Sequence, residues 1–600
     1  MISYMYFRLT KTKTTPVLQL VESFRDSEGR PRQKILLSLG NADLPKEIWQ
    51  EVSEEIANRL KGIQTFLKPS SEIEKWVERI IKELSKSQKS EQKDFSAAGK
   101  IQVNPGDITH FDTTELGPLL PVIKAWESLG FPSILANIGF SPVQIRDAAL
   151  SIMNRLLDPC SENSLPHWMN TTSFEDLFGQ SIREGKKDRF YRIADKLYKN
   201  KEKLEIALRE KEVSLFNLEE TIILYDLTNT YFEGQCDQNP KGKRGNSKEK
   251  RFDAPLLSVG LVLDSEGFVI RHDVFDGNSH DSKNLLPMVR KLQASGKDDQ
   301  KPLIVLDSGF SSEDNLKELR SAGFDYIVVG KRPTRLAYEK EFATLPFEEI
   351  KGRTDKPSIN IAVKDEDTER IILCQSQARG EKEKSMISIA ETRYLKDLEK
   401  LKTRLEKGRL KKKDTIYKTL GRLLERHPRV ARYYKTRFDE NTFSLSWERL
   451  DEAHEQALKT CGSYYLRSSR KDLDKEKIWH IYITLTRIES GFKALKSNLG
   501  LRPIYHHRED RCDSHIFITI LAYRLLHYIE HSLRTQNETR SWVTIRRLLK
   551  THAYTTIVLP SSEGKTFHLR IPGSPESEQK RIYDLLDIDY SRLPKRQIVF

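Results

Sequence analysis

The chain has 600 residues, which exceeds the size at which a single hydrophobic core stops growing and predicts three or four domains. Lys and Arg outnumber Asp and Glu by 101 to 87, and this net charge of +14 favours nucleic acid as a partner over a merely well-solvated surface. We expect a soluble protein, because MISYMYFRLTKTK lacks a signal peptide's apolar run and the apolar stretch 516–529 is too short to span a bilayer. The five cysteines are scattered, which argues against a disulfide framework or a zinc site.

The first 220 residues are predicted to hold two regions joined by a linker, and both regions are candidates for DNA binding. Residues 1–85 are typical of a small α+β domain, with strands at 17–21 and 34–39 and an amphipathic helix at 45–67. Residues 86–105 are polar and aperiodic, which indicates a linker. Residues 106–220 are predicted to be helical. Ser141 and Pro142 have N-cap and first-turn chemistry before a helix at 143–157, and a second helix begins near Ser164. Plain helix packing is favoured there over a DNA-reading pair of helices.

Strands alternate with helices between residues 221 and 340. The turn at 265–267 predicts that the strands on either side of it pair as a hairpin. The last two strands are almost continuously apolar, so the fold class is α/β, with a mixed sheet covered by helices on both faces. The predicted strands span residues 221–228, 256–264, 267–275, 302–307 and 325–330, and the predicted helices span 282–292 and 313–322.

The segment from about 340 to 470 has a different pattern, because a long basic stretch replaces the alternation. Strands are predicted at 358–363 and 370–374, followed by a basic helical region that continues to Arg437. A further strand pair is predicted at 442–447 and 463–466. The chain then returns to a strongly amphipathic helix at 475–499 and a second apolar helix at 514–532.

Two aspartates end predicted strands. Asp226 lies late in the first core strand and Asp307 ends the fourth. If these strands are adjacent and parallel, their carboxyl ends lie side by side, where α/β proteins place their active sites. Two carboxylates that close repel each other and need a cation, and hard oxygen ligands suit Mg²⁺ or Mn²⁺. A lone aspartate at a strand end is more often a turn former, but the shared topology favours a metal site.

A third acid, Glu489, lies on the amphipathic helix at 475–499. Tyr482, Glu489 and Lys496 are seven residues apart, so each is displaced by only ~20° around the helix from the one before. The spacing predicts one polar row at the edge of the apolar stripe, with Gly500 as a C-terminal cap. An ordinary boundary row of an amphipathic helix is the alternative interpretation.

These segments together resemble a known family. YDLTNTYFEG, VLDSGFSSEDNL and the Y-x6-E-x6-K row resemble the DDE insertion-sequence transposases with a ribonuclease H-like core, specifically the subgroup with a Tyr-Arg-Glu-Lys signature. VESFRDSEGRPRQKILLSLG, FDGNSHD and FKALKSNLGLRPIYHHRED extend the resemblance over most of the chain. It implies a catalytic core in two parts, 221–340 and 471–555, interrupted by an insertion domain at 341–470 and followed by a C-terminal region at 556–600.

The resemblance also implies roles for single residues. Asp226, Asp307 and Glu489 would hold the metal ions, Mg²⁺ or in its place Mn²⁺, and Tyr482 and Lys496 would contact DNA phosphates. One position departs from the signature, because Leu485 stands where the family has arginine. Arg487 lies on roughly the opposite helix face and is not expected to replace it.

Further candidates for DNA contact are basic and lie near these acids. One set belongs to the segment CDQNPKGKRGNSKEKRF between the first two strands, and Lys493 lies one turn after Glu489. Asp281, in the pair His280-Asp281, is a reserve for Asp307, and His506-His507 is expected to contact phosphate or solvent rather than metal. Trp479 is expected to pack in the core rather than stack on a displaced base. The basic candidates are Lys243, Arg244, Lys248, Arg251 and Lys493.

The implied function is a DNA transposase. Cleavage at terminal inverted repeats would precede transfer of the freed ends to target DNA, by two-metal phosphoryl transfer. Double-stranded DNA is the expected partner, a homodimer the expected synaptic state, and the cytoplasm, in association with the nucleoid, the expected location. Two alternatives stay open: an inactive relic that only binds DNA, which Leu485 favours, and another ribonuclease H-like nuclease.

Overall fold

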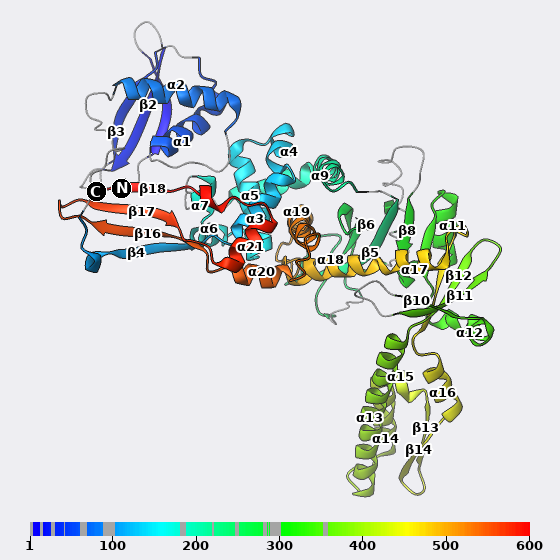
Figure 1. The fold of residues 1–600 in the computed structure, drawn as a ribbon. Helices are drawn as coiled ribbons and strands as arrows, with labels where there is room; N and C mark the ends of the chain where they lie inside the picture. The colour runs from blue at the N-terminus through cyan, green and yellow to red at the C-terminus, as the bar shows by residue number, and fades with distance from the viewer. Residues whose placement is uncertain are drawn as a thin grey trace. The chain divides into compact units, whose positions relative to one another are not determined.

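The computed structural model describes residues 4–600 apart from 12–15, 26–30, 41–42, 61–68, 88–101, 180–187, 219–220, 246–250, 280–284, 286, 289–301 and 352–357. The fold, drawn as a ribbon in Figure 1, divides into two compact units. Unit 1 comprises Met1–Glu219, Leu227–Ser279 and Glu489–Phe600, and unit 2 comprises Glu220–Asp226 and His280–Ile488. No helix among the described residues has the length and apolar character needed to cross a membrane.

Unit 1 begins with a three-stranded antiparallel sheet in the order β1-β2-β3 (Tyr4–Lys11, Pro16–Arg25, Pro31–Ser38). Helices α1 (Trp49–Leu60) and α2 (Ser71–Ser87) provide the other half of its core. Phe7, Leu20 and Leu37 are opposite one another on the three strands and face this core. The strands and the helix predicted here are confirmed, except that 61–67 lies outside the described residues. Strand β1 and helix α2 were not predicted, and most of the predicted linker is not described.

Seven helices, α3 to α9, occupy much of the described part of residues 106–220, the region predicted to be helical, although Thr109–Glu115 form a strand. Ser141 and Gln144 form a capping box at the start of α5, and Ser164 precedes α6, both as the sequence indicates. The later helix α19 (Glu509–Arg534) packs against α3, α5 and α8, so these helices enclose an apolar core of unit 1. Its other helices are α3 (Leu119–Ser128), α4 (Phe131–Asn137), α5 (Pro142–Leu157), α6 (Leu165–Thr171), α7 (Phe174–Phe178), α8 (Asp188–Lys199) and α9 (Lys201–Phe216).

A four-stranded antiparallel sheet joins the beginning of this region to the C-terminus. Its order is β18-β17-β16-β4, from Arg596–Val599, Thr566–Pro572, Ala553–Pro560 and Thr109–Glu115. Helices α20 (Trp542–Leu549) and α21 (Ser577–Leu585) flank these strands in the sequence. The pairing of β4 with β16 spans more than 430 residues of sequence, and no local pattern predicts it.

The hairpin of β6 (Leu256–Asp264) and β7 (Val269–Asp276) in unit 1 confirms the prediction for these strands. Asp264 shapes the turn, because one of its carboxylate oxygens accepts hydrogen bonds from the N–H groups of Glu266 and Phe268, each at 2.9 Å. Gly267 has a φ of +94°, a conformation that favours glycine.

Unit 2 is built on a mixed sheet, as predicted. From one edge its strands run β10-β11-β12-β15-β9-β8-β5, and β5 continues past Asp226 into unit 1. Strands β5, β8 and β9 are parallel to one another, and those from β15 to β10 are antiparallel. The bounds are β5 (Ile222–Tyr231), β8 (Leu303–Leu306), β9 (Tyr326–Val329), β10 (Glu348–Ile350), β11 (Ile359–Asp365), β12 (Arg370–Gln375) and β15 (Ser463–Ser468), with helices α11 (Glu313–Ser321) and α12 (Glu339–Thr344). The helix predicted at 282–292 lies mostly outside the described residues.

An arm occupies most of the chain between β12 and β15 (Figure 1). Its helices α13 (Gln377–Glu406), α14 (Lys413–Arg426) and α15 (Pro428–Ala431) share an apolar core with the hairpin of β13 (Tyr434–Asp439) and β14 (Ser444–Arg449). Helix α16 (Asp451–Lys459) then leads back to the sheet.

Two sequence predictions for this segment are wrong. The helical region does not reach Arg437, because β13 begins at Tyr434, where β-branched and aromatic residues alternate with basic ones. The strands predicted at 442–447 and 463–466 do not pair with each other: β14 pairs with β13, whereas β15 inserts between β12 and β9.

The helix predicted from 475 to 499 is also wrong in one respect, because it is two helices. Helix α17 spans Lys475–Ile483 and α18 spans Leu485–Ser497. Both the N–H and the hydroxyl of Thr484 donate to the carbonyl of Ile481, at 3.1 and 2.5 Å, and the N–H of Arg487 donates to the carbonyl of Thr484 at 2.8 Å. These bonds to the third residue back tighten the chain and interrupt the α-helical ladder. Tyr482 therefore belongs to α17, whereas Glu489 and Lys496 belong to α18.

Candidate functional site

The two strand aspartates are neighbours in unit 2. Strand β5 pairs with β8 in parallel, with Tyr225 opposite Leu306, so Asp226 and Asp307 are the next residues on adjacent strands. Adjacent strands lie about 4.8 Å apart, and residues side by side on them direct their side chains to the same face. The topology predicted from the sequence is confirmed, and it brings the two carboxylates to one edge of the sheet.

The position of this pair follows from where β8 ends. Strand β8 stops at Leu306, whereas β5 continues to Tyr231, so Asp226 is the first residue of β5 beyond the stretch that pairs with β8. Asp307 is exposed and begins a short 3₁₀ turn, Ser308–Phe310, but its carboxylate does not cap that turn. Asp226 is half-buried. The sheet thus ends in an acidic edge on a rigid apolar support, since Leu224, Val305 and Leu306 are fully buried.

The third predicted acid lies in the other unit. Glu489 is exposed on α18, where the chain passes from unit 2 to unit 1. Lys493 lies four residues later on the same helix face and is also exposed, and Lys496 is half-buried. Among the residues that the structure describes, no three or more His, Cys, Asp or Glu side chains are grouped as metal ligands. The structure therefore brings two of the three acids together, and the triad stays a prediction.

The residues around Tyr482 form an aromatic cluster in unit 2. Its ring centroid lies 6.0 Å from that of Tyr464, which is on β15. Trp479 is buried and its indole N–H donates to the Tyr464 hydroxyl at 3.1 Å, so the expectation of core packing for Trp479 is confirmed. Leu485, at the first position of α18, is 8% exposed. The position that carries arginine in the signature is therefore buried in this chain.

A basic loop after β5 carries Lys243 and Arg244, whose side chains are exposed. Its backbone is bonded to β6, because the N–H and carbonyl of Lys243 pair with the carbonyl and N–H of Leu256. A Cβ placed on Gly277 would come within 2.0 Å of the Leu256 carbonyl oxygen and 2.7 Å of that of Lys243. The glycine of FDGN thus permits three backbone segments to approach closely. The motif that contains this glycine stands out in the sequence, but its packing role could not be predicted from it.

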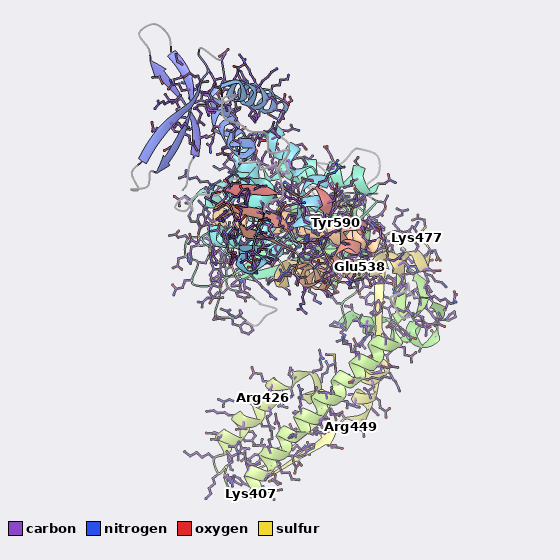
Figure 2. All side chains as sticks on the ribbon, turned by 60° about the vertical axis from the view of Figure 1, so that its left-hand side comes forward. Lys407, Arg426, Arg449, Lys477, Glu538 and Tyr590 are labelled. Carbon is purple, nitrogen blue, oxygen red and sulfur yellow. The ribbon has the colours of Figure 1, made fainter. Side chains whose placement is uncertain are left out.

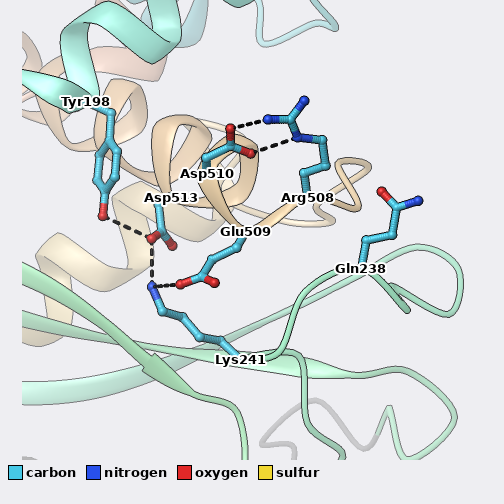
Figure 3. A pocket seen from close by; sticks show the side chains of 7 residues that line it. All are labelled: Tyr198, Gln238, Lys241, Arg508, Glu509, Asp510 and Asp513. Atoms are coloured by element: carbon cyan, nitrogen blue, oxygen red, sulfur yellow. Dashed lines mark hydrogen bonds and ion pairs between the residues drawn. The ribbon is translucent and has the colours of Figure 1, made fainter.

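Lys241 fixes the other end of this loop. It lies in an open pocket of about 620 Å³ whose wall on the opposite side is the start of α19 (Figure 3). Its ammonium group donates to Asp513 at 2.7 Å and lies 2.9 Å from Glu509, while the Tyr198 hydroxyl donates to Asp513 at 2.9 Å. Burial alone lowers the pKa of Lys241, but its bonds to these carboxylates raise it above the usual range, so the lysine stays charged. Lys241 is therefore an anchor rather than a free cation.

Arg251 is less available than the sequence suggests. Its guanidinium forms two hydrogen bonds with Asp253, at 3.0 and 3.1 Å, and lies 4.8 Å from the centroid of the Tyr231 ring. A phosphate would have to compete with this carboxylate. Among the described basic residues of this segment, Lys243 and Arg244 are exposed. Lys248 lies outside the part of the chain that the structure describes.

The arm of unit 2 holds most of the excess positive charge. Residues 393–437 contain 17 Lys and Arg but only 5 Asp and Glu. Apolar side chains such as Tyr394, Leu398 and Leu420 fill the interior, so the charged side chains project outward along the arm, where Lys407 and Arg426 are labelled (Figure 2). Arg409, Lys411 and Lys412 are exposed at the turn between α13 and α14 and form no ion pair with any described residue.

The histidine candidates give no metal site in the described part of the chain. His506 lies 3.4 Å from the Glu162 carboxylate in unit 1. Burial alone raises the pKa of Glu162, but the nearby His506 and Arg155 outweigh burial and lower this pKa to about 2. The backbone carbonyl of His507 accepts a weak bond from the Cys236 thiol. His280 and Asp281 lie outside the described residues.

The donor chemistry of the acidic edge fits a hard divalent cation. Asp226 and Asp307 offer carboxylate oxygens, the ligands that Mg²⁺ and Mn²⁺ prefer, and no thiol or imidazole group of the described residues joins them. Because the exposed Asp307 carboxylate makes no hydrogen bond or ion pair with a described residue, it is available as a ligand.

Two family models match the chain. A model of the transposase DDE domain matches residues 217–525, and a model of the N-terminal domain of IS1634 family transposases matches residues 7–94. Among solved structures, a piggyBac transposase synaptic complex with hairpin DNA is similar at 11% identity and a TM-score of 0.32, over 72% of this chain and 79% of that one. A Mos1 transposase paired-end complex with the left transposon end matches at 13% identity and a TM-score of 0.14, over 47% and 78%. No curated protein matches the chain significantly.

Proposed function

The chain belongs to the family of transposases with a DDE domain, and we propose that it cleaves DNA at the terminal inverted repeats of an insertion sequence and transfers the freed ends to target DNA. The observation that carries this proposal is the pair of Asp226 and Asp307 on adjacent parallel strands. The N-terminal match to IS1634 family transposases supports the insertion-sequence class.

We assign the metal site to Asp226, Asp307 and Glu489 on a ribonuclease H-like core. Two bound Mg²⁺ ions, or Mn²⁺ in their place, would supply Lewis-acid stabilisation of the phosphoryl group and a lowered pKa for the attacking hydroxyl. Strands β5 and β8 hold the Asp226 and Asp307 carboxylates in place, because their apolar residues are buried in the interior of the sheet. Glu489 is presented by α18, whose apolar residues Ile488, Phe492 and Leu495 are buried.

Basic and polar side chains would position the DNA. Lys493 follows Glu489 by one turn, and Lys496 and Tyr482 are the other phosphate contacts that the Tyr-Arg-Glu-Lys signature implies. Lys243 and Arg244 present two more cations on a loop that is anchored at Lys241. Lys248 and Arg251 belong to the same segment, although Arg251 must first release Asp253.

The partner is double-stranded DNA, first the inverted repeats and then the target. Because two transposon ends must be joined to one target, a homodimeric synaptic complex fits the reaction. We propose the cytoplasm, in association with the nucleoid, as the location, because the proposed substrate is DNA. A relic that only binds DNA is the second candidate, and the buried Leu485 at the signature arginine position favours it.

The decisive experiment removes one carboxylate at a time. Asp226→Asn, Asp307→Asn and Glu489→Gln are each expected to abolish cleavage of inverted-repeat DNA in Mg²⁺ while DNA affinity is kept, because the acids bind metal rather than DNA. Cleavage rate and affinity are measured on the same preparation, and chelation of the metal should stop wild-type cleavage reversibly.

Asp314→Asn is the matched control, because Asp314 is exposed on α11 of the same unit and has no proposed role. Substantial cleavage by one of the three variants removes that residue from the triad. A wild-type chain that binds the repeat but never cleaves it, in either Mg²⁺ or Mn²⁺, supports the relic. Cleavage without strand transfer supports another ribonuclease H-like nuclease.

A further inference from the structure

The N-terminal sheet of unit 1 has one apolar and one polar face. Phe7, Leu20 and Leu37 are aligned across the three strands and belong to the core that the sheet shares with α1 and α2. The neighbouring row, Arg8, Gln19 and Ser38, is also aligned across the strands. Because side chains alternate between the faces of a sheet, this second row lies on the face opposite to the helices.

The polar face carries a connected side-chain network. Arg8 donates from Nε to the Gln19 side-chain oxygen at 3.2 Å and from Nη1 to that of Gln33 at 3.0 Å. The Thr10 hydroxyl also donates to Gln19, at 2.9 Å, and the Gln19 amide donates to the Ser38 hydroxyl at 3.4 Å. Arg8 and Gln19 are half-exposed, whereas Gln33 and Ser38 are exposed. The network holds these long side chains in defined positions without removing them from solvent.

Charge and residue type indicate what this face would bind. Residues 1–40, which contain the strands, have seven Lys and Arg against three Asp and Glu, whereas residues 41–87, which contain the helices, have eight against nine. The strand layer is therefore the positive part of the domain and suits a polyanion. Arg and Gln are the side chains that form paired hydrogen bonds with guanine and adenine in the major groove. Ile35, 48% exposed, is opposite Val21 in the register and offers an apolar contact for a thymine methyl group.

The dimensions agree with this partner. Three strands with a spacing of about 4.8 Å place the outer strand axes about 10 Å apart. The major groove of B-DNA is about 12 Å wide, and strands are a known means of reading it. A single network that spans all three strands would thus face the floor of one groove.

We infer that the polar face of this sheet docks in the major groove of duplex DNA, with Arg8, Gln19 and Gln33 reading base edges. The inference rests on the proposed function, because it makes this face the element that recognises the inverted repeat. The phosphate contacts of the loop and the arm would then add affinity, and the sheet would add sequence discrimination.

The test selects bound sequences from a random pool of DNA duplexes with the full-length wild-type chain. Affinities are then measured for the selected duplex and for a scrambled one. Gln19→Ala, Gln33→Ala and Arg8→Ala should each weaken binding to the selected duplex by roughly 5- to 150-fold, the range for loss of one paired base contact. Binding to the scrambled duplex should remain nearly unchanged for the two Gln variants, and selection with each variant should lose preference at one or two positions.

Lys75→Gln is the control, because Lys75 is exposed on α2, in the helical layer. It removes a positive charge from the same domain and should change neither the selected sequence nor the affinity ratio. Thermal melting of every variant checks that the domain is folded, and Gln19→Glu gives a second variant at the central position, expected to reject the selected duplex.

Three outcomes overturn the inference: unchanged selection by the variants, equal loss on selected and scrambled duplexes, or no selected sequence with the wild-type chain. Cleavage of supercoiled DNA in Mg²⁺, measured on the same wild-type preparation, decides the proposed function separately. If the wild type cleaves while the three variants keep its sequence preference, the transposase stands and the sheet is not its reader.

Discussion

Asp226 and Asp307 show how much of a site a few residues determine. Each follows a short apolar run, and such runs form buried strands of a mixed sheet. Once β5 and β8 pair in parallel with Tyr225 opposite Leu306, Asp226 and Asp307 are neighbours at the edge where β8 ends. The basic side chains are less predictable, because a sequence does not reveal which cations are already paired. Lys241 pairs with Asp513, which is far away in the sequence, and Arg251 pairs with Asp253, two residues later. Lys243, in contrast, is exposed.

Leu485 provides a prediction at this scale. Leu485→Arg restores the signature of the resembling subgroup, but Leu485 is 8% exposed at the start of α18, so the guanidinium would enter an apolar interior. An unpaired buried charge costs about 3–5 kcal/mol. We therefore expect a lower melting temperature and no gain in cleavage, measured on one preparation.

The control for this substitution is Ser497→Arg, because Ser497 is exposed at the end of the same helix and should tolerate arginine. A Leu485→Arg variant that melts like the wild type and cleaves faster would show that an arginine contact is missing from this chain.

At the scale of elements, periodicity predicts the type of an element better than its partners or its interruptions. The hairpin of β6 and β7, strand β9 and helix α19 follow from local patterns. The break at Thr484 does not, because threonine, although a weak helix former, occurs inside many helices. The interruption depends on its hydroxyl and on bonds to the third residue back. Strand β15 pairs with β12 and β9 across long stretches of sequence, which a local pattern cannot reveal.

Gly277 provides a prediction for the basic loop. In Gly277→Ala the new methyl group would overlap the Leu256 carbonyl oxygen, 2.0 Å from the position of its Cβ, and this atom is backbone and cannot move alone. The loop that carries Lys243 and Arg244 should be displaced from β6. We expect DNA affinity to fall and the melting temperature to decrease. The free energy of unfolding should fall by about 1–3 kcal/mol, as at other overpacked sites.

Gly421→Ala is the comparison for the same chemical change. Nothing lies within 4 Å of a Cβ at Gly421, which is inside α14, so alanine should stabilise that helix slightly, by about 0.5–1 kcal/mol. Normal DNA binding by Gly277→Ala would show that the basic loop does not need its close contact with β6.

At the scale of the whole molecule, charge is divided unevenly. The chain has a net charge of +14, and residues 393–437 alone contain 17 basic and 5 acidic residues. The sequence indicates this concentration directly. It does not indicate that the segment forms an arm with its own apolar core, because that depends on the hairpin of β13 and β14 packing against α13. A core of this kind makes the arm a fixed support for cations rather than a flexible tail.

The arm therefore gives the last prediction. If its cations neutralise phosphates, log affinity for DNA should fall linearly with log salt concentration, with a slope of about −0.9 for each phosphate neutralised. The triple variant Arg409→Gln, Lys411→Gln and Lys412→Gln removes three exposed cations that have no ion-pair partner among the described residues. Its slope should be shallower by up to about 2.7.

The control removes the same charge elsewhere, with Lys203→Gln, Lys317→Gln and Lys580→Gln. These residues are exposed on α9, α11 and α21, and their loss should leave the slope near that of the wild type. Equal slopes for the arm variant and the wild type would mean that the arm does not contact DNA. Equal reductions in both triple variants would mean that net charge alone, rather than the arm, sets the affinity.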